Sequence, residues 1–197
     1  MSTTHIVSWG IAAVLVFWAV GAYNRLVRLR NVIANAFAQI DVQLKRRYDL
    51  IPNLVEVASK YLAHERETLE AVTAARNQAK AAADLVRSRP GTAGPVSSLS
   101  MAEQVLHGAL GRLMGLVEAY PELKADQTLR ELSEELTSTE NKVSFARQLF
   151  NDATLDYNNA AQQFPARVLA GLFGFREAAM LQATTSDTER GSLRVKF

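Results

Sequence analysis

The sequence contains no cysteine and only three histidines among its 197 residues. Without cysteine, the chain can form neither disulfide bonds nor thiolate metal sites. His5 is separated from His64 and His107 by a long apolar stretch, which argues against a three-histidine zinc site. The 22 basic and 20 acidic residues nearly cancel, so the composition lacks the basic excess of a nucleic-acid-binding protein. We therefore predict no cofactor and no nucleic-acid partner.

An uncharged apolar stretch near the N-terminus, residues 6–23, reads IVSWGIAAVLVFWAVGAY. As a helix it would be about 27 Å long, close to the ~30 Å thickness of a bilayer's hydrocarbon core. A cleaved signal peptide is the alternative, but a signal peptide carries its positive charge before the apolar stretch. Here Arg25, Arg28 and Arg30 follow it. We therefore predict a retained transmembrane helix over residues 6–23, with residues 1–5 outside the cell and the remainder in the cytoplasm. The three arginines can also contact anionic lipid headgroups.

The rest of the sequence repeats its apolar residues at intervals of seven, which is typical of helices that pack against one another. The series are Leu26, Ile33 and Ile40; Ala58, Val72, Ala79 and Val86; Leu99, Leu106 and Leu113; and Leu129, Leu136, Val143 and Phe150. The pattern predicts an all-α fold in which the single transmembrane helix is followed by an up-down antiparallel four-helix bundle over residues 24–164.

Prolines and glycines indicate where these helices end. We expect the first helix to leave the membrane and continue to about Tyr48, and the second to begin near Pro52, because proline is favoured in the first turn of a helix. The remaining breaks fall at residues 88–98, Tyr120–Pro121 and Phe164–Pro165. In this arrangement the loop at residues 88–98 and the segment after Pro165 lie near the bilayer surface.

An apolar segment, residues 165–183, separates the predicted bundle from a C-terminal tail at residues 184–197. Its apolar side chains are too few to span a bilayer. They are Val168, Leu169, Leu172, Phe173 and Phe175. Two interpretations stay open: the segment seals the base of the bundle, or it lies among the lipid headgroups.

Several motifs resemble those of the LemA family of bacterial membrane proteins. They are YNRLVRLRNVIANAFAQIDVQLKRRYDLIPNLVEVASKYLAHERETLEAVTAAR (residues 23–76), TENKVSFARQLFNDATLDYNNAAQQFP (residues 139–165) and GLFGF (residues 171–175). The resemblance covers about residues 20–180. It implies a four-helix body behind an N-terminal anchor in the bacterial inner membrane, and it implies no defined biochemical activity. Phe37 stands where similar sequences usually have tryptophan, a change that preserves an aromatic core contact.

Charged residues on or beside the apolar seams predict a buried polar network, because an unpaired buried charge costs several kcal/mol. The candidates are His64, Glu65, Arg76, Glu140 and Arg147. Two other interpretations stay open: a site for a partner or ligand, and a metal site at His64, Glu65 and Glu140. The metal interpretation is weak, because the sequence has neither E-x-x-H nor H-E-x-x-H.

Gly108, Gly111 and Gly115 share one side of the third predicted helix. Glycine inside a helix costs about 1 kcal/mol relative to alanine, a cost usually offset by the close approach of another backbone. We expect that backbone to come from within the bundle rather than from a partner. The basic run from Lys45 to Arg47 fits the C-terminal end of the first helix, where cations favour the helix dipole. A surface for an acidic partner is the other interpretation of this run.

The sequence contains no recognisable catalytic motif: G-x-S-x-G, a P-loop and a dinucleotide-binding fingerprint are all missing. We therefore predict a non-enzymatic, membrane-anchored scaffold that self-associates and organises envelope membrane or partner proteins. An adaptor that presents its bundle to a membrane protease or another envelope protein is the alternative. The third possibility is a metal-dependent activity in the bundle core.

Overall fold

The computed structural model describes residues 3–181, and this part of the chain is all-helical, without strands. The helices are α1 (Thr3–Ser59), α2 (Arg66–Ser88), α3 (Ala93–Ala119), α4 (Pro121–Ala125), α5 (Gln127–Gln162) and α6 (Ala166–Leu172). The all-α class predicted from the heptad pattern is confirmed. The predicted C-terminal tail, residues 184–197, lies outside the described residues.

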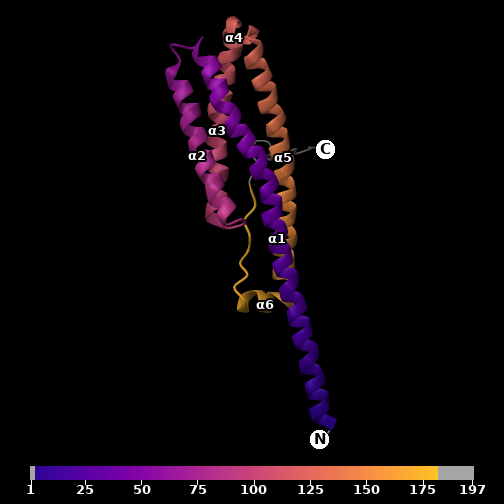
Figure 1. Ribbon diagram of the computed structural model, residues 1–197. Helices are drawn as coiled ribbons and strands as arrows, with labels where there is room; N and C mark the ends of the chain where they lie inside the picture. Colours follow the sequence, from indigo (N-terminus) through magenta and orange to yellow (C-terminus); the bar gives the residue numbers. More distant parts are fainter. Residues whose placement is uncertain (1–2, 182–197) are drawn as a thin grey trace, which may run out of the picture.

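The four long helices α1, α2, α3 and α5 lie side by side and alternate in direction (Figure 1). Helix α1 packs along α5, α2 packs along α3, and α1 also contacts α2. The α1–α2 connection and α4 lie at the end of this body that is far from the N-terminus, and α6 lies across the opposite end. The first third of α1 projects beyond the body as a single helix.

The projecting part of α1 contains a window long and apolar enough to cross a membrane, and none of that window is buried against the chain. Phe17, for example, is 78% exposed. In the helix of a soluble core such residues would be covered. From Leu26 onward the same helix enters the body, where the side chains spaced at sevens become buried.

The core follows the heptad series. Ile33, Ile40 and Leu44 of α1 are almost fully buried, and the ring of Phe37 meets the edge of Phe150 of α5 at a centroid distance of 6.1 Å. The aromatic contact expected for Phe37 is therefore present. One apolar cluster connects α1, α2, α3 and α5.

Helix α1 does not end near Tyr48, contrary to the sequence-based expectation; it runs through Pro52 to Ser59. Proline inside a helix removes the N–H that would bond to the carbonyl four residues earlier, here that of Tyr48. The Nε of Arg76, on α2, donates a hydrogen bond to this carbonyl oxygen at 2.9 Å. A charged donor from the neighbouring helix thus satisfies the carbonyl that Pro52 leaves without a partner, and α1 continues.

The α2–α3 loop is not at the end of the body nearest the projecting helix, where we expected it. Gly91 of this loop packs near Ile33, which lies about 15 Å beyond Tyr23 along the axis of α1. Gly91 has φ +78°, a conformation that L side chains rarely adopt, and a Cβ there would lie 3.2 Å from that of Ala178. The loop is displaced because α2 begins only at Arg66 and is shorter than predicted.

After α6 the chain returns along the body as an extended strap, residues 173–181. Side-chain amides of α5 pair with its backbone: Asn158 bonds both the N–H and the carbonyl of Ala178, and Asn151 does the same with Leu181, all at 2.9 Å. The N–H of Ala179 also donates to the carbonyl of Gly91 at 2.9 Å. These bonds hold α6 and the strap against the body.

Candidate functional site

A buried charged cluster lies where α1, α3 and α5 meet. Arg47 is only 3% exposed, and its Nη1 lies 2.7 Å from Oε2 of Glu103 and 2.9 Å from Oε2 of Glu140. The hydroxyl of Tyr48 donates to Oε1 of Glu103 at 2.5 Å. Arg47 therefore ties α1 to both α3 and α5, and each oxygen of Glu103 has a donor.

In this cluster the attraction between opposite charges opposes the cost of removing those charges from water. Burial raises the pKa of Glu103, while the charge of Arg47 and the hydrogen bond from Tyr48 act in the opposite direction. Arg147 also faces this carboxylate and favours its ionised form. Burial is the main reason why the pKa of the Tyr48 hydroxyl is raised, and the negative charge of Glu103 is the second. The hydroxyl therefore stays protonated and acts as a donor. Removing one member of such a buried set leaves an uncompensated charge, at a cost of about 3–5 kcal/mol.

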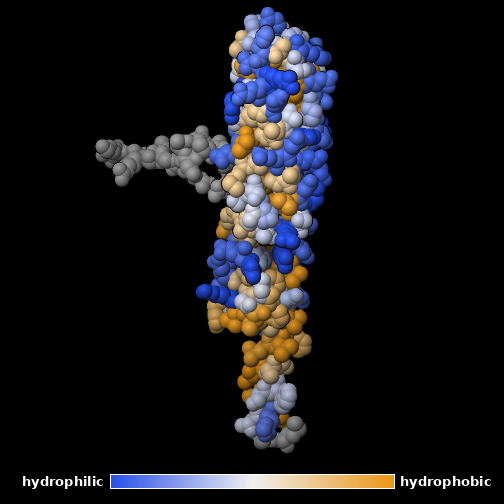
Figure 2. Space-filling view, turned by 90° about the vertical axis from the view of Figure 1, so that its left-hand side faces the viewer, coloured by the Kyte–Doolittle hydropathy of each residue, from blue (hydrophilic) through white to orange (hydrophobic). Residues whose placement is uncertain are grey.

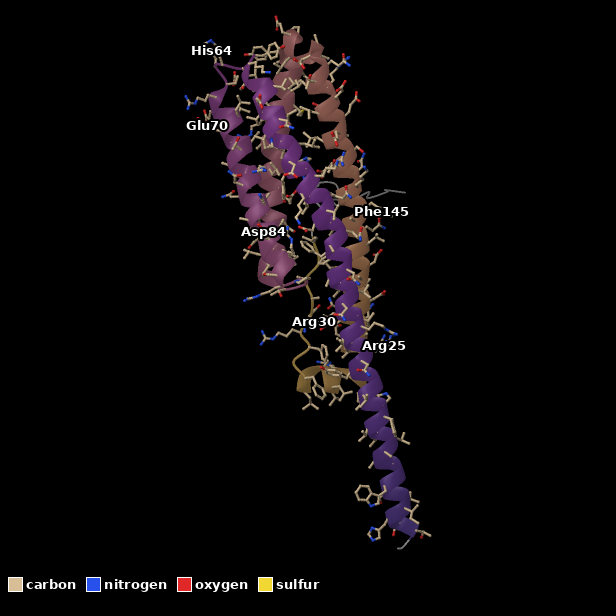
Figure 3. The ribbon with its side chains drawn as sticks, in the orientation of Figure 1. Arg25, Arg30, His64, Glu70, Asp84 and Phe145 are labelled. Carbon is tan, nitrogen blue, oxygen red and sulfur yellow. The ribbon has the colours of Figure 1, made fainter. Side chains whose placement is uncertain are left out.

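The structure brings together only some of the residues predicted for the network. Glu140 and Arg147 lie in the cluster, and Arg76 lies apart, on the carbonyl of Tyr48. His64 and Glu65 belong to the α1–α2 connection at the far end of the body, where His64 is exposed (Figure 3). Their expected membership of the network is corrected: because α1 continues through Pro52, both residues fall in the connection before α2, His64 in a turn and Glu65 as the N-cap residue.

Three members of the cluster were missed from the sequence: Arg47, Tyr48 and Glu103. The signal was present for two of them. Arg47 continues the series Leu26, Ile33 and Ile40 at the next interval of seven, which is a core position. Glu103 lies four residues after Leu99 and three before Leu106, on the same helix face. The basic run that includes Arg47 therefore does not mark the end of a helix; it lies inside α1.

A second set of charges connects α1 to α2. Nη2 and Nε of Arg87 lie 2.6 and 2.9 Å from the two carboxylate oxygens of Asp41. Lys45 lies 3.2 Å from the same carboxylate. Burial opposes the ionisation of Asp41, but the hydrogen bonds from Arg87 and Lys45 outweigh it, and its pKa is lowered.

Two openings adjoin the buried cluster. A cavity of about 20 Å³, large enough for about one water molecule, is bordered by Ser100, Glu103 and Arg147. A groove of about 320 Å³ between α3 and α5 is bordered by His107, Gly111 and Glu140 among others. Within residues 3–181, no group of three or more His, Asp or Glu side chains is placed to hold a metal ion.

The glycines of α3 do not meet another backbone. Nothing lies within 4 Å of a Cβ built at Gly108, Gly111 or Gly115. The expectation that they allow close packing inside the body is therefore wrong. They line the outer side of α3 instead, partly along the groove at Gly111.

The arginines after the apolar stretch and the segment after Pro165, both predicted to lie near a membrane, gather at one end of the body. Arg25, Arg28 and Arg30 are exposed on α1 just above α6, as the labelled Arg25 and Arg30 show (Figure 3). The apolar side chains of the segment after Pro165 surround α6: Val168, Leu172 and Phe173 are exposed, and Leu169 and Phe175 are half-buried. The rings of Phe173 and Phe175 pack edge-on against Tyr23, at 5.1 and 5.5 Å.

Comparison with known proteins finds relatives that are about a quarter identical to this chain. The magnetosome protein MamQ of Magnetospirillum gryphiswaldense is 25% identical over 169 residues, which cover 78% of this chain and 62% of MamQ. MamQ 2 of Paramagnetospirillum magneticum is 25% identical over 183 residues, covering 81% of this chain and 64% of that protein. The chain thus spans less than two thirds of the length of these MamQ relatives.

A third relative, the protein LemA of Metamycoplasma hominis, is 26% identical over 174 residues, covering 88% of this chain and 74% of that protein. None of these three names denotes an enzyme. A sequence model of the LemA family matches residues 36–197, a range that holds all members of the buried cluster from Arg47 to Arg147. With the family pattern extending over most of the helical body, this chain belongs to the LemA family.

Proposed function

We propose that this protein is a non-enzymatic, membrane-anchored scaffold that self-associates and organises the membrane or the partner proteins of the bacterial envelope. The observation that carries the proposal is the continuity of α1. One unbroken helix contains both the exposed apolar segment and the first helix of the packed body. An anchor joined to its body in this way holds that body at a fixed angle to the membrane.

The length of α1 fits a protein that supports or spaces other components at the membrane. From Asn24 to Ser59, α1 extends about 54 Å beyond the apolar segment. The body built on it, an up-down antiparallel bundle of α1, α2, α3 and α5, would stand away from the bilayer as a rod. Arg25, Arg28 and Arg30 favour a cytoplasmic position for this rod at the inner membrane, by the positive-inside rule.

Retention of the anchor is supported by the packing immediately after it. Tyr23 contacts Phe173 and Phe175, and Leu26 is buried against Ala160, Ala161 and Ala170. Cleavage close to the end of the apolar segment would remove contacts that hold α6 in place.

One side of the body has the features of a protein-binding surface. A groove of about 490 Å³ between α1 and α5 is bordered by Phe145 and Leu149, with Gln39 and Lys142 among its polar neighbours. Phe145 is 66% exposed and points away from α5 (Figure 3). An exposed aromatic residue with a polar rim is typical of the centre of an interface. Self-association through this groove would link neighbouring rods.

Crosslinking in native membranes tests the proposal, because the chain has no cysteine and each introduced thiol is unique. Phe145→Cys should give a crosslinked dimer with a bifunctional maleimide, because one thiol per chain can join two copies. Lys80→Cys, on α2 and away from α5, is the matched control and should give none. Electron microscopy of the detergent-purified protein should show regular assemblies. A Phe145→Cys protein that stays uncrosslinked, together with a monomeric mass in solution, would refute self-association.

The same experiment addresses the adaptor alternative, in which the body is presented to a membrane protease or another envelope protein. An adaptor would crosslink through Phe145→Cys to one different, thiol-bearing protein, without forming a dimer of its own.

A further inference from the structure

Helix α6 has an apolar face that the chain leaves uncovered. Ala170 packs on the body in a cluster with Leu26, Ala160 and Ala161. Val168 and Leu172, four residues apart, share a face on the opposite side of the helix and are 56% and 75% exposed. Pairs of exposed apolar side chains on the outer face of so short a helix indicate a contact that is made outside the chain.

This face continues the surface of the projecting segment. The rings of Phe173 and Phe175 meet Tyr23, the last residue of the uncharged stretch. The space-filling view shows apolar residues running without a break from the projecting helix onto the base of the body, with hydrophilic residues directly above (Figure 2). Helix α6 therefore lies at the level where a membrane-spanning α1 would leave the hydrocarbon.

Positive charge surrounds the same end of the body. Five exposed arginines come from two separate parts of the chain: Arg25, Arg28, Arg30, Arg167 and Arg176. None of the five forms an ion pair with a carboxylate among residues 3–181. Glu177 of the strap, which lines the same cleft as Arg167, sets one negative charge against these five, so the charge of the group stays positive. Arginines above an apolar face match the layering of anionic headgroups above acyl chains.

A cleft beside α6 adds a place for a headgroup. Its volume is about 510 Å³, and its walls include Gln162, Arg167, Gly171, Phe175 and the acidic Glu177. A guanidinium, an amide and an aromatic ring together offer hydrogen bonds and a cation to a phosphodiester.

From these observations we propose that α6 is a second membrane contact, which lies in the headgroup layer and binds anionic phospholipid through Arg167 and Arg176. The proposal rests on the membrane anchor of the proposed function and on no part of the self-association. The bilayer is the occupant because the apolar face is continuous with the segment that would span it. Docking of α6 would fix the tilt of the rod at a second point.

The test uses the full chain in vesicles, with an environment-sensitive fluorophore on Leu172→Cys. Leu85→Cys, an exposed leucine on α2, is the matched control. The vesicles contain phosphatidylcholine, with or without phosphatidylglycerol, and a lipid quencher at headgroup depth. A carbonate wash first shows whether the protein stays with the vesicles. Loss of the protein at that step refutes the anchor itself and is thereby distinguished from failure of α6 to dock.

We expect the label at residue 172 to be quenched by the lipid quencher, most strongly with phosphatidylglycerol, and the label at residue 85 to stay in water. Replacing Arg167 and Arg176 by glutamine should weaken docking about fivefold for each charge removed. Arg112→Gln with Arg130→Gln, which removes two charges elsewhere on the body, should leave the quenching unchanged.

Three results would overturn the inference. A label at residue 172 that stays as water-exposed as that at residue 85 shows that α6 does not dock. Equal quenching with and without phosphatidylglycerol, unaffected by loss of Arg167 and Arg176, shows that anionic lipid is not recognised. A label that is dry but unquenched, and that becomes wet on dilution with excess lipid, shows that a second copy covers the face.

Discussion

Replacing Arg47 by methionine would test whether the buried cluster holds the body together. The substitution keeps an unbranched, apolar stem and removes the charged guanidinium. Glu103 would then lie buried beside Glu140 without the guanidinium that bridges them, and Arg147 would be the remaining cation of the cluster. The side chain of Glu140 is 28% exposed and can turn to solvent, whereas that of Glu103 is 11% exposed and cannot. The expected cost is therefore about 3 kcal/mol, at the lower end of the range for a broken buried pair.

Urea and thermal unfolding of the full chain in mild detergent, followed by far-UV circular dichroism, would measure this cost. A loss of about 3 kcal/mol corresponds to a fall in Tm of roughly 6–12 °C for a domain of this size. Arg46→Met is the matched control: the side chain of Arg46 is 62% exposed and pairs with Glu135 at the surface. Its loss should cost less than about 1 kcal/mol.

A triple variant separates charge balance from packing. Replacing the three buried members together, as Arg47→Met with Glu103→Leu and Tyr48→Phe, leaves Glu140 and Arg147, which are both partly exposed. Its stability should recover most of the loss seen in Arg47→Met, since apolar replacement of a buried ion pair is often close to neutral. The reasoning is refuted if Arg47→Met is as stable as the Arg46→Met control, or if the triple variant is no more stable than Arg47→Met.

Three further changes test single contacts. Arg76→Leu should cost about 2 kcal/mol of unfolding free energy in the natural sequence. The cost should be clearly lower beside Pro52→Ala, which restores an N–H to the Tyr48 carbonyl. Equal costs in a double-mutant cycle would contradict this role of Arg76. Asp41→Asn should cost about 1 kcal/mol at neutral pH, because Arg87 is partly exposed. Since pairing lowers the pKa of Asp41, this stabilisation is present above its ordinary value of 3.8 and is lost as pH falls through the folded-state value; a cost that persists in strong acid would show another cause. The pKa of Glu103 is raised, so the stabilisation that its protonated form gives to the folded state is complete below 4.5 and is lost as pH rises through the folded-state value. Glu103→Gln should remove that part of the pH dependence of unfolding.

The heptad pattern and the local composition were enough to predict much of the chain's secondary structure. The uncharged segment, the all-helical class and the corner at Tyr120–Pro121 follow from hydropathy and from the properties of proline. These signals depend on neighbouring residues in the sequence, which is why they can be read without knowing what packs against them. The placement of Arg47 and Glu103 at seam positions belongs to the same class, although a charge at such a position is easily assigned to the surface.

Tertiary structure decided the features that depend on residues distant in sequence. Pro52 by itself favours the start of a helix, and only Arg76, arriving from α2, allows α1 to pass through it. The strap is equally non-local, because the amides of Asn151 and Asn158 hold backbone that follows them by 20 to 30 residues. Local sequence determined where helices could form; long-range contacts determined where α1 ends, which charges meet in the core, and which face of α6 is left uncovered.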